Sequence, residues 1–186
     1  MRDRERCGTV GFMLIRKEAP QDAAAVEDVH RSAFAPMTPP GRTDPVEVEL
    51  VQALRDSGAW IEDLSFVAER DDEVVGHVCL TRGTVGNLPA LALGPLGVRA
   101  DAQGLRIGSA LMHAAIGAAE ARREGVVVLL GHVGYYPHFG FVPAASLGIT
   151  PDVAEWAGPS FMARPLDAYT PELRGEFRYP APFYEL

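Results

Sequence analysis

The stretch best suited to chemistry is residues 91–112, which read LALGPLGVRADAQGLRIGSALM. An apolar, strand-like run leads through a short polar loop into a turn that carries Gly104, and a long helical pattern follows. The first N–H groups of a helix have no partner within it, the helix dipole makes that end partly positive, and glycine lets a ligand approach closely. This order of elements predicts an anion site with a pyrophosphate as its occupant. On spacing alone, Gly104 and Gly108 are equally consistent with close helix packing.

The same stretch lacks both the G-x-G-x-x-G of dinucleotide sites and the Gly-Lys-Ser/Thr of a P-loop. Val98 and the residues QGLRIGSAL at 103–111 instead resemble the acyl-CoA-binding motif of the GNAT superfamily of N-acetyltransferases. In that motif Gln or Arg, two residues, Gly, one residue, and Gly or Ala follow a strand valine by about five residues. The residues YYPHFGF at 135–141 resemble a later motif of the family, and residues 93–98 and 49–55 resemble its small bacterial branch.

The resemblance covers about residues 13–145 in order and spacing. It implies an α/β (α+β) fold of GNAT type, with a mixed central sheet whose fourth and fifth strands splay apart and helices on both sides. Acetyl-CoA is the implied co-substrate, its pantetheine lying between the splayed strands, and no metal is required. A bulge at Gly94-Pro95 fits the opening, because proline has no N–H for a strand ladder. The implied cofactor contacts are Leu96, Gly97 and Val98 of the fourth strand and Gln103, Gly104, Leu105, Arg106, Ile107, Gly108 and Ser109 of the turn.

One residue departs from the family motif, because Arg106 stands where the family has its first helix glycine. A right-handed helical backbone at Arg106 keeps its N–H in place, and its guanidinium then adds a charge-assisted contact to a CoA phosphate. The alternative is that Arg106 points to solvent and contributes nothing.

Transfer of an acetyl group to an amine makes three demands. An amine with a pKa of about 10.4 costs roughly 4.6 kcal/mol to deprotonate at pH 7. The carbonyl oxygen becomes an oxyanion, for which an amide at Leu96 or Gly97 is suited, and the thiolate then leaves. The resemblance assigns the general acid to Tyr136, five residues before Phe141, with Tyr135 as alternate; a core aromatic is the other reading. The implied reaction is direct transfer in a ternary complex.

The sequence does not identify the general base that takes the proton of the acceptor amine. His132, His77, Glu47 and Glu49 are candidates, and each is better explained without a catalytic role, since a water chain serves as base. His30 and His113 are expected to be ordinary helix residues, and Cys79 a buried, inert thiol. Trp156 and Trp60 either line the acceptor pocket or lie in the core.

The elements that must position these residues follow from hydrophobic periodicity. Proline-rich residues 36–45 form a loop, and a tight turn at 71–73 makes a hairpin of its two flanking strands. We expect helices over residues 22–33, 46–56 and 103–124, and strands over 13–16, 64–69, 74–81, 88–98, 126–130, 139–142 and 161–166.

The 186 residues have a net charge of −8, which excludes a dedicated nucleic-acid binder. Cys7 and Cys79 make neither a disulfide scaffold nor a zinc pattern. No run reaches the roughly 18 apolar residues of a membrane span, and the N-terminus lacks a secretory signal, so we expect a cytoplasmic protein without a membrane partner. We expect a leader over residues 1–12, Met13 as the native start, and one domain over 13–186, as monomer or homodimer.

The acidic excess is concentrated in one segment. Residues 44–73 hold ten acidic side chains against Arg55 and Arg70, a net charge equal to that of the whole chain. Such a field favours a cationic amine, from a small molecule or a peptide, although a solvated face explains the same count. A non-catalytic acyl-CoA-binding module and transfer to a hydroxyl or of a longer acyl chain remain alternatives.

Overall fold

The structure, a computed structural model, describes residues 12–185. Over these residues one mixed sheet has the order β1-β2-β3-β4-β5-β8-β6, and β9 pairs with the far end of β3 and with β7. The strands are β1 (Met13–Lys17), β2 (Trp60–Arg70), β3 (Glu73–Val85), β4 (Leu88–Val98), β5 (Val126–Leu130), β6 (Val142–Pro143), β7 (Ile149–Pro151), β8 (Phe161–Pro165) and β9 (Gly175–Arg178). The helices are α1 (Ala23–Phe34), α2 (Val46–Asp56) and α3 (Ile107–Ala121).

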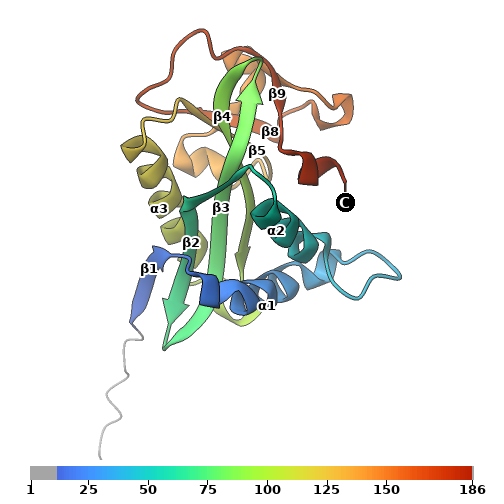
Figure 1. Cartoon of the computed structure of the whole chain (residues 1–186), viewed down its shortest axis with the longest axis vertical. Coiled ribbons are helices and arrows are strands. Elements are labelled where there is room, and N and C mark those ends of the chain that lie inside the picture. Colours follow the sequence, from blue (N-terminus) through green and yellow to red (C-terminus); the bar gives the residue numbers. More distant parts are fainter. Residues whose placement is uncertain (1–11, 186) are drawn as a thin grey trace, which may run out of the picture.

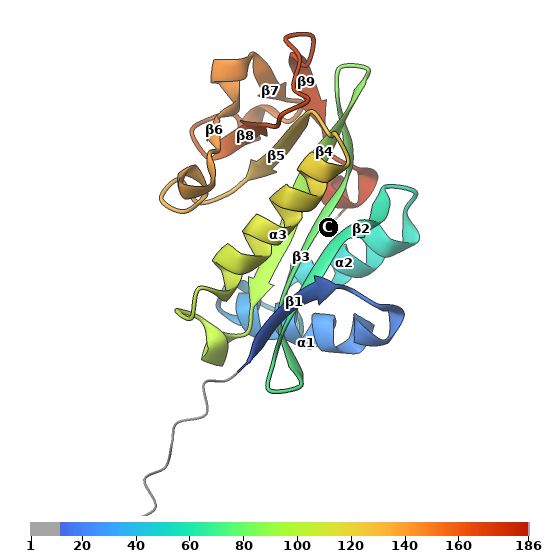
Figure 2. The same ribbon diagram turned by 90° about the vertical axis from the view of Figure 1, so that its left-hand side faces the viewer.

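Helices cover both faces of the sheet, with α1 and α2 on one side and α3 on the other (Figures 1 and 2). The periodicity of α2 is confirmed, because Val48, Val51 and Leu54 are buried. On the opposite face Gly76 of β3 lets α3 approach the sheet closely. A Cβ at Gly76 would lie 3.0 Å from the side chains of both Ile107 and Leu111.

The bulge expected in β4 is confirmed by its register against β3. Leu80 pairs with Leu93 and Val78 pairs with Leu96, so Gly94 and Pro95 together lie opposite the single residue Cys79. The extra residue bends β4 at this point, which turns its last residues toward the start of α3.

The splay of β4 and β5 is also confirmed. The two strands pair in parallel only at Leu91–Val127 and Ala92–Val128 over the described residues. Beyond Ala92, β4 continues for six residues to Val98 while β5 ends at Leu130. The backbone of β4 is therefore open on this side between the bulge and the strand end.

Several predicted boundaries differ from the structure. The third helix begins at Ile107 rather than at residue 103, because residues 103–106 form a turn that includes left-handed backbone. The strand expected near residues 139–142 is shorter and lies later in the chain, at Val142–Pro143, because Tyr136–Phe139 forms a 3₁₀ helix. The hairpin around residues 71–73 is confirmed, and its strands run longer than predicted because β1, β4 and β9 supply pairing partners.

The chain end returns to the middle of the fold. After β9, the 3₁₀ helix Ala181–Tyr184 lies against α2, as Figure 1 shows. The predicted leader at residues 1–12 lies, apart from Phe12, outside the described residues. Within residues 12–185 no helix is both long and apolar enough to cross a membrane.

Candidate functional site

The turn between β4 and α3 encloses a hollow of about 410 Å³, which we call the phosphate hollow. Eight of the ten residues implied as cofactor contacts line it, namely Leu96, Val98, Gln103, Gly104, Arg106, Ile107, Gly108 and Ser109. Leu105 is half-exposed and does not line it, and Gly97 faces away, because a Cβ there would lie 2.8 Å from the His30 ring of α1.

The first turn of α3 presents backbone donors to the phosphate hollow. The N–H of Ala110 donates to the Arg106 carbonyl, and no side chain caps the helix. Among the described residues, the backbone N–H groups of Ile107, Gly108 and Ser109 have no backbone acceptor, as expected for the first N–H groups of a helix. These donors and the positive end of the helix dipole suit an anion.

Two residues, Gln103 and Gly108, shape the phosphate hollow as well as line it. The Gln103 amide donates to the Val98 carbonyl at 3.1 Å, which ties the turn to the end of β4. Gly108 makes room for Tyr135, because a Cβ at residue 108 would lie 2.8 Å from the Tyr135 hydroxyl. The glycine therefore allows an aromatic side chain to reach the start of α3.

The backbone of Arg106 differs from the sequence expectation. Its φ of 61° and ψ of 15° are left-handed, not right-handed helical, in the position where the resembled family has glycine. Left-handed backbone brings Cβ close to the following carbonyl in any residue other than glycine. Arg106 nevertheless lines the phosphate hollow, and no ion pair engages its guanidinium within residues 12–185.

We expect Arg106→Gly to raise the free energy of unfolding by about 1 kcal/mol, because glycine adopts left-handed backbone without the Cβ clash. Arg106→Ala removes the same side chain and keeps the strain, so it serves as the matched control. Urea unfolding of the three proteins measures the difference. Equal stability of the glycine and alanine variants would show that the turn relaxes without strain.

A second, larger cavity of about 610 Å³ lies where β4 and β5 diverge, and we call it the central cavity. Its sheet side comes from the two splayed strand ends and the segment after β5: Leu93, Gly94, Pro95, Leu96, Leu130, Gly131, His132, Tyr135 and Tyr136. Leu96 and Tyr135 line both the central cavity and the phosphate hollow, so the two spaces adjoin each other.

Tyr136 packs at the open end of β5. A Cβ at Gly131 would lie 2.3 Å from the Tyr136 ring, so glycine is required for the ring to rest on the strand end. The ring also meets Tyr135 edge-on, with centroids 5.1 Å apart. Burial raises the pKa of Tyr136 to about 12, so its hydroxyl keeps its proton throughout the neutral range.

The opposite side of the central cavity comes from elements far apart in sequence. Trp156 was considered for this pocket from the sequence and lines it, whereas Trp60 lies against Arg55 outside it. The other members were not singled out: Phe34, Met37, Leu50, Tyr179 and Phe183. No local pattern marks them, because they meet only after β9 and the last 3₁₀ helix return to α2.

Two of the four candidate bases line the central cavity, namely Glu47 and His132. Glu47 lies in the first turn of α2 and is half-buried, and burial raises its pKa. His132 accepts a hydrogen bond from the Gly134 N–H through Nδ1 at 3.1 Å. Glu49 does not line the cavity and pairs with Arg42 at 2.6 Å.

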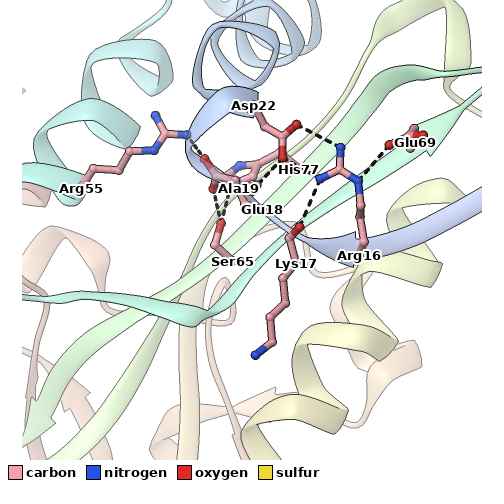
Figure 3. Close-up of polar contacts among 9 residues, drawn as sticks. All are labelled: Arg16, Lys17, Glu18, Ala19, Asp22, Arg55, Ser65, Glu69 and His77. Carbon is pink, nitrogen blue, oxygen red and sulfur yellow. Dashed lines mark hydrogen bonds and ion pairs between the residues drawn. The ribbon is translucent and has the colours of Figure 1, made fainter.

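His77 lies instead in a buried polar network between α1 and the sheet (Figure 3). Its Nε2 is 3.1 Å from the Glu18 carboxylate and 3.0 Å from the Ser65 hydroxyl, and its Nδ1 is 2.8 Å from Nε2 of His30. Arg55 also donates to Glu18. No residue of the network lines the central cavity, so we assign it to the support of the fold.

The remaining histidines and the cysteine contribute to packing. His113 is exposed at the edge of Phe139, whereas His30 is fully buried beside His77. Cys79 is also fully buried, and burial raises its pKa, which agrees with an inert thiol.

Five of the ten acidic side chains in residues 44–73 form ion pairs with cations from outside that segment. The ion pairs are Asp44–Arg31, Glu49–Arg42, Asp63–Lys17, Asp63–Arg122, Glu69–Arg16 and Glu73–Arg99. Glu47 has no ion pair among the described residues and is the one carboxylate of this segment that lines the central cavity. The local charge at the cavity is therefore a single carboxylate rather than a broad negative field.

Known proteins resemble this chain in both sequence and fold. A family model described as an acetyltransferase (GNAT) domain matches residues 62–143. The uncharacterized N-acetyltransferase YjhQ of Escherichia coli (strain K12) is 30% identical over 128 residues, so the match spans 67% of this chain and 66% of that relative.

Two solved structures extend the likeness over nearly the whole chain. A GNAT family acetyltransferase from Brucella melitensis, in complex with acetyl-CoA, is 32% identical with a TM-score of 0.73, covering 92% of this chain and 98% of its own. The N-acetyltransferase YhbS of Escherichia coli, in complex with CoA, has a TM-score of 0.79 at 23% identity, covering 94% and 93%. The second likeness concerns the fold alone.

Proposed function

Since the chain belongs to the GNAT family of acyl-CoA-dependent acetyltransferases, we propose that it transfers the acetyl group of acetyl-CoA directly to a primary amine in a ternary complex. The observation that carries the proposal is that the phosphate hollow and the central cavity adjoin, with Leu96 and Tyr135 lining both. A pyrophosphate at the start of α3 and a thioester between the splayed strands fit these two spaces. The acetyl-CoA complex of the Brucella melitensis relative supports the same co-substrate.

In this proposal acetyl-CoA is held mainly by backbone. Its pyrophosphate accepts hydrogen bonds from the free N–H groups at Ile107, Gly108 and Ser109, and its pantetheine lies along β4 at residues 96–98. Gln103 and Gly108 act by shaping the turn, and Leu105 and Gly97 contribute backbone only. The guanidinium of Arg106 is positioned at the rim to meet a phosphate oxygen.

The chemical step has a simple balance. The acceptor's ammonium gives one proton to a base, for which the central cavity offers Glu47 and His132. The amine nitrogen attacks the thioester carbonyl, an N–C bond forms, and an amide of β4 near Leu96 stabilises the oxyanion. The C–S bond then breaks and its electron pair goes to sulfur, while the nitrogen loses its second proton to water to leave a neutral amide. The Tyr136 hydroxyl hydrogen-bonds the leaving thiolate.

The proposal predicts stoichiometric acetyl-CoA binding that depends on Gly108. Gly108→Val places a branched side chain against Tyr135 inside the phosphate hollow, whereas Gly117→Val adds the same side chain on α3 where nothing lies within 4 Å. We expect the first change to weaken acetyl-CoA affinity at least about 10-fold, since it blocks backbone access to an anion. Gly117→Val is expected to bind as the unaltered protein does. Calorimetry with acetyl-CoA and CoA measures both, and absence of binding to the unaltered protein would contradict the proposal.

A non-catalytic acyl-CoA-binding module is the second candidate, and the arginine at the family's glycine position is the observation in its favour. A module of this kind would also bind acetyl-CoA, but it would not transfer the acetyl group. Free CoA released from acetyl-CoA upon addition of primary amines excludes it, whereas binding without release across a broad amine panel favours it.

A further inference from the structure

The acceptor side of the central cavity is dominated by aromatic side chains. Trp156, Tyr179 and Phe183, which we call the aromatic wall, face the splayed strands from the C-terminal part of the chain. Phe34, Met37 and Leu50 complete the same side from α1, α2 and the loop between them. A site of this composition binds the apolar part of a ligand by burying it from water.

The aromatic wall is held in one arrangement by its own contacts. Tyr179 meets Trp156 edge-on with centroids 5.4 Å apart, and meets Phe183 at 4.7 Å. The Tyr184 hydroxyl accepts from the Tyr179 N–H at 2.8 Å and donates to Asp152 at 2.8 Å. These bonds fasten the last 3₁₀ helix to β9, so the wall exists before a ligand binds and little ordering is needed.

The polar groups that face the aromatic wall are few. Glu47 supplies one carboxylate, half-buried and with no ion partner among the described residues. The Tyr179 hydroxyl is fully buried and is therefore not presented to a ligand. On this side of the cavity an acceptor meets one group that attracts positive charge, the Glu47 carboxylate, and otherwise apolar side chains, while His132, Tyr135 and Tyr136 line the sheet side.

This distribution discriminates among classes of amine. An ammonium group gains from the Glu47 carboxylate and from nearby aromatic faces. A polyamine or an aminoglycoside brings further ammonium groups, which would lie unpaired against apolar surface, and burying an unpaired charge is costly. A peptide N-terminus brings backbone N–H and C=O groups that this surface leaves without partners.

We propose that the acceptor is a monoamine with an apolar body about the size of an aromatic ring, with its ammonium held by Glu47 and its body against the aromatic wall. The inference rests on the acetyl transfer proposed above. It names Glu47 as the residue that selects a single positive charge, and the aromatic wall as the surface that selects the apolar body.

The first test compares amines that differ in one property. Release of CoA from acetyl-CoA is measured with 2-phenylethylamine, ethylamine, spermidine, an aminoglycoside and a short peptide with a free N-terminus. We expect kcat/KM for 2-phenylethylamine to exceed that for ethylamine at least about 50-fold, the scale of burying one aromatic ring. Equal or better turnover of ethylamine, spermidine, the aminoglycoside or the peptide overturns the inference while leaving the proposed transfer intact.

The second test isolates the carboxylate. Glu47→Gln is compared with Glu49→Gln, which alters an exposed carboxylate of the same helix outside the central cavity. We expect Glu47→Gln to lower kcat/KM for 2-phenylethylamine at least about 10-fold without altering acetyl-CoA affinity, and Glu49→Gln to change neither. If acetyl-CoA binds and no amine is acetylated, calorimetry of 2-phenylethylamine with the CoA-loaded protein decides. Absence of binding there, or equal binding by both variants, overturns the assignment of Glu47.

Discussion

Tyr136→Phe is expected to lower kcat at least about 100-fold while leaving the affinity for acetyl-CoA nearly unchanged, the scale typical of losing one hydrogen-bond donor to charge that develops in the transition state. The ring is retained, so its packing on Gly131 and its edge contact with Tyr135 persist. Only the hydroxyl is removed, and with it the hydrogen bond to the sulfur as the C–S bond breaks. A loss confined to kcat identifies an interaction made in the transition state.

The raised pKa of Tyr136 decides whether this hydroxyl transfers its proton or only donates a hydrogen bond. With a pKa of about 12 it remains a phenol between pH 7 and pH 10. A thiol has a pKa of about 8.5, so full transfer of the phenol proton to the thiolate is uphill by roughly 5 kcal/mol. The hydroxyl therefore stabilises the thiolate as a hydrogen-bond donor, and we expect no fall in kcat between pH 7 and pH 10 from ionisation of Tyr136.

Two further tyrosine variants serve as controls. Tyr169→Phe alters a hydroxyl that meets the Leu173 carbonyl outside the central cavity, and activity is expected to be unchanged. Tyr135→Phe alters the hydroxyl beside Gly108, so its effect is expected on acetyl-CoA affinity rather than on kcat. A kcat loss in Tyr135→Phe together with normal kcat in Tyr136→Phe would reverse the roles of the two residues.

The parts of the site that the sequence predicted are those encoded in one continuous stretch. The β4 bulge, the turn at residues 103–109 and the start of α3 follow each other within 16 residues, and each has a local physical cause. Proline lacks an N–H for the ladder at Pro95, and glycine permits the positive φ of 78° at Gly104. The splayed strands followed from the family resemblance and are seen in the register of β4 and β5.

The parts that the sequence did not predict depend on contacts between distant segments. Tyr179 and Phe183 reach the central cavity because β9 pairs with the far end of β3, and no residue pattern near them marks that return. The net charge of residues 44–73 overstates the local negative charge for the same reason, since Arg31, Lys17 and Arg99 pair with it from other elements. Summing charges along the sequence misses such partners.

Glu18→Gln is expected to lower the free energy of unfolding at pH 7 by about 3 kcal/mol, the usual scale for breaking a buried ion pair from one side. The carboxylate is only 7% exposed and accepts from Arg55, Ser65 and His77, which belong to α2, β2 and β3 (Figure 3). Glutamine keeps the shape of the Glu18 side chain but removes its negative charge. Its NH₂ group, itself a hydrogen-bond donor, then faces the donors that contact Glu18. Arg55, only 16% exposed, is left without its carboxylate.

The pH dependence of this loss follows from the pKa of Glu18. Burial alone raises that pKa, but the hydrogen bonds from His77 and Ser65 and the charge of Arg55 outweigh it and lower the value from 4.5 to about 2. A lowered pKa gives stability that is fully present above pH 4.5 and is lost as the pH falls toward 2, in total roughly 3 kcal/mol. The difference between the two proteins is therefore constant above pH 4.5 and shrinks below it.

The two histidines of the network, His30 and His77, are both neutral, and each donates a hydrogen bond to the next group in the network. Burial lowers the pKa of His30 and of His77, so His77 donates through Nε2 toward Glu18 and Ser65, and accepts at Nδ1 from Nε2 of His30. The remaining atom, His30 Nδ1, has no hydrogen-bond partner among the described residues and lies against Gly97 of β4. The network thus joins the loop after β1 to the helices that carry Phe34 and Glu47.

Urea unfolding between pH 7 and pH 3.5 measures the expected loss, with Asp63→Asn as the matched control. Asp63 also pairs with two cations, Lys17 and Arg122, but it is 56% exposed, so its removal is expected to change stability by no more than about 0.5 kcal/mol. Comparable losses in the two variants would mean that burial does not strengthen the Glu18 contacts. A Glu18→Gln difference that stays constant from pH 4.5 to pH 3.5 would contradict the lowered pKa.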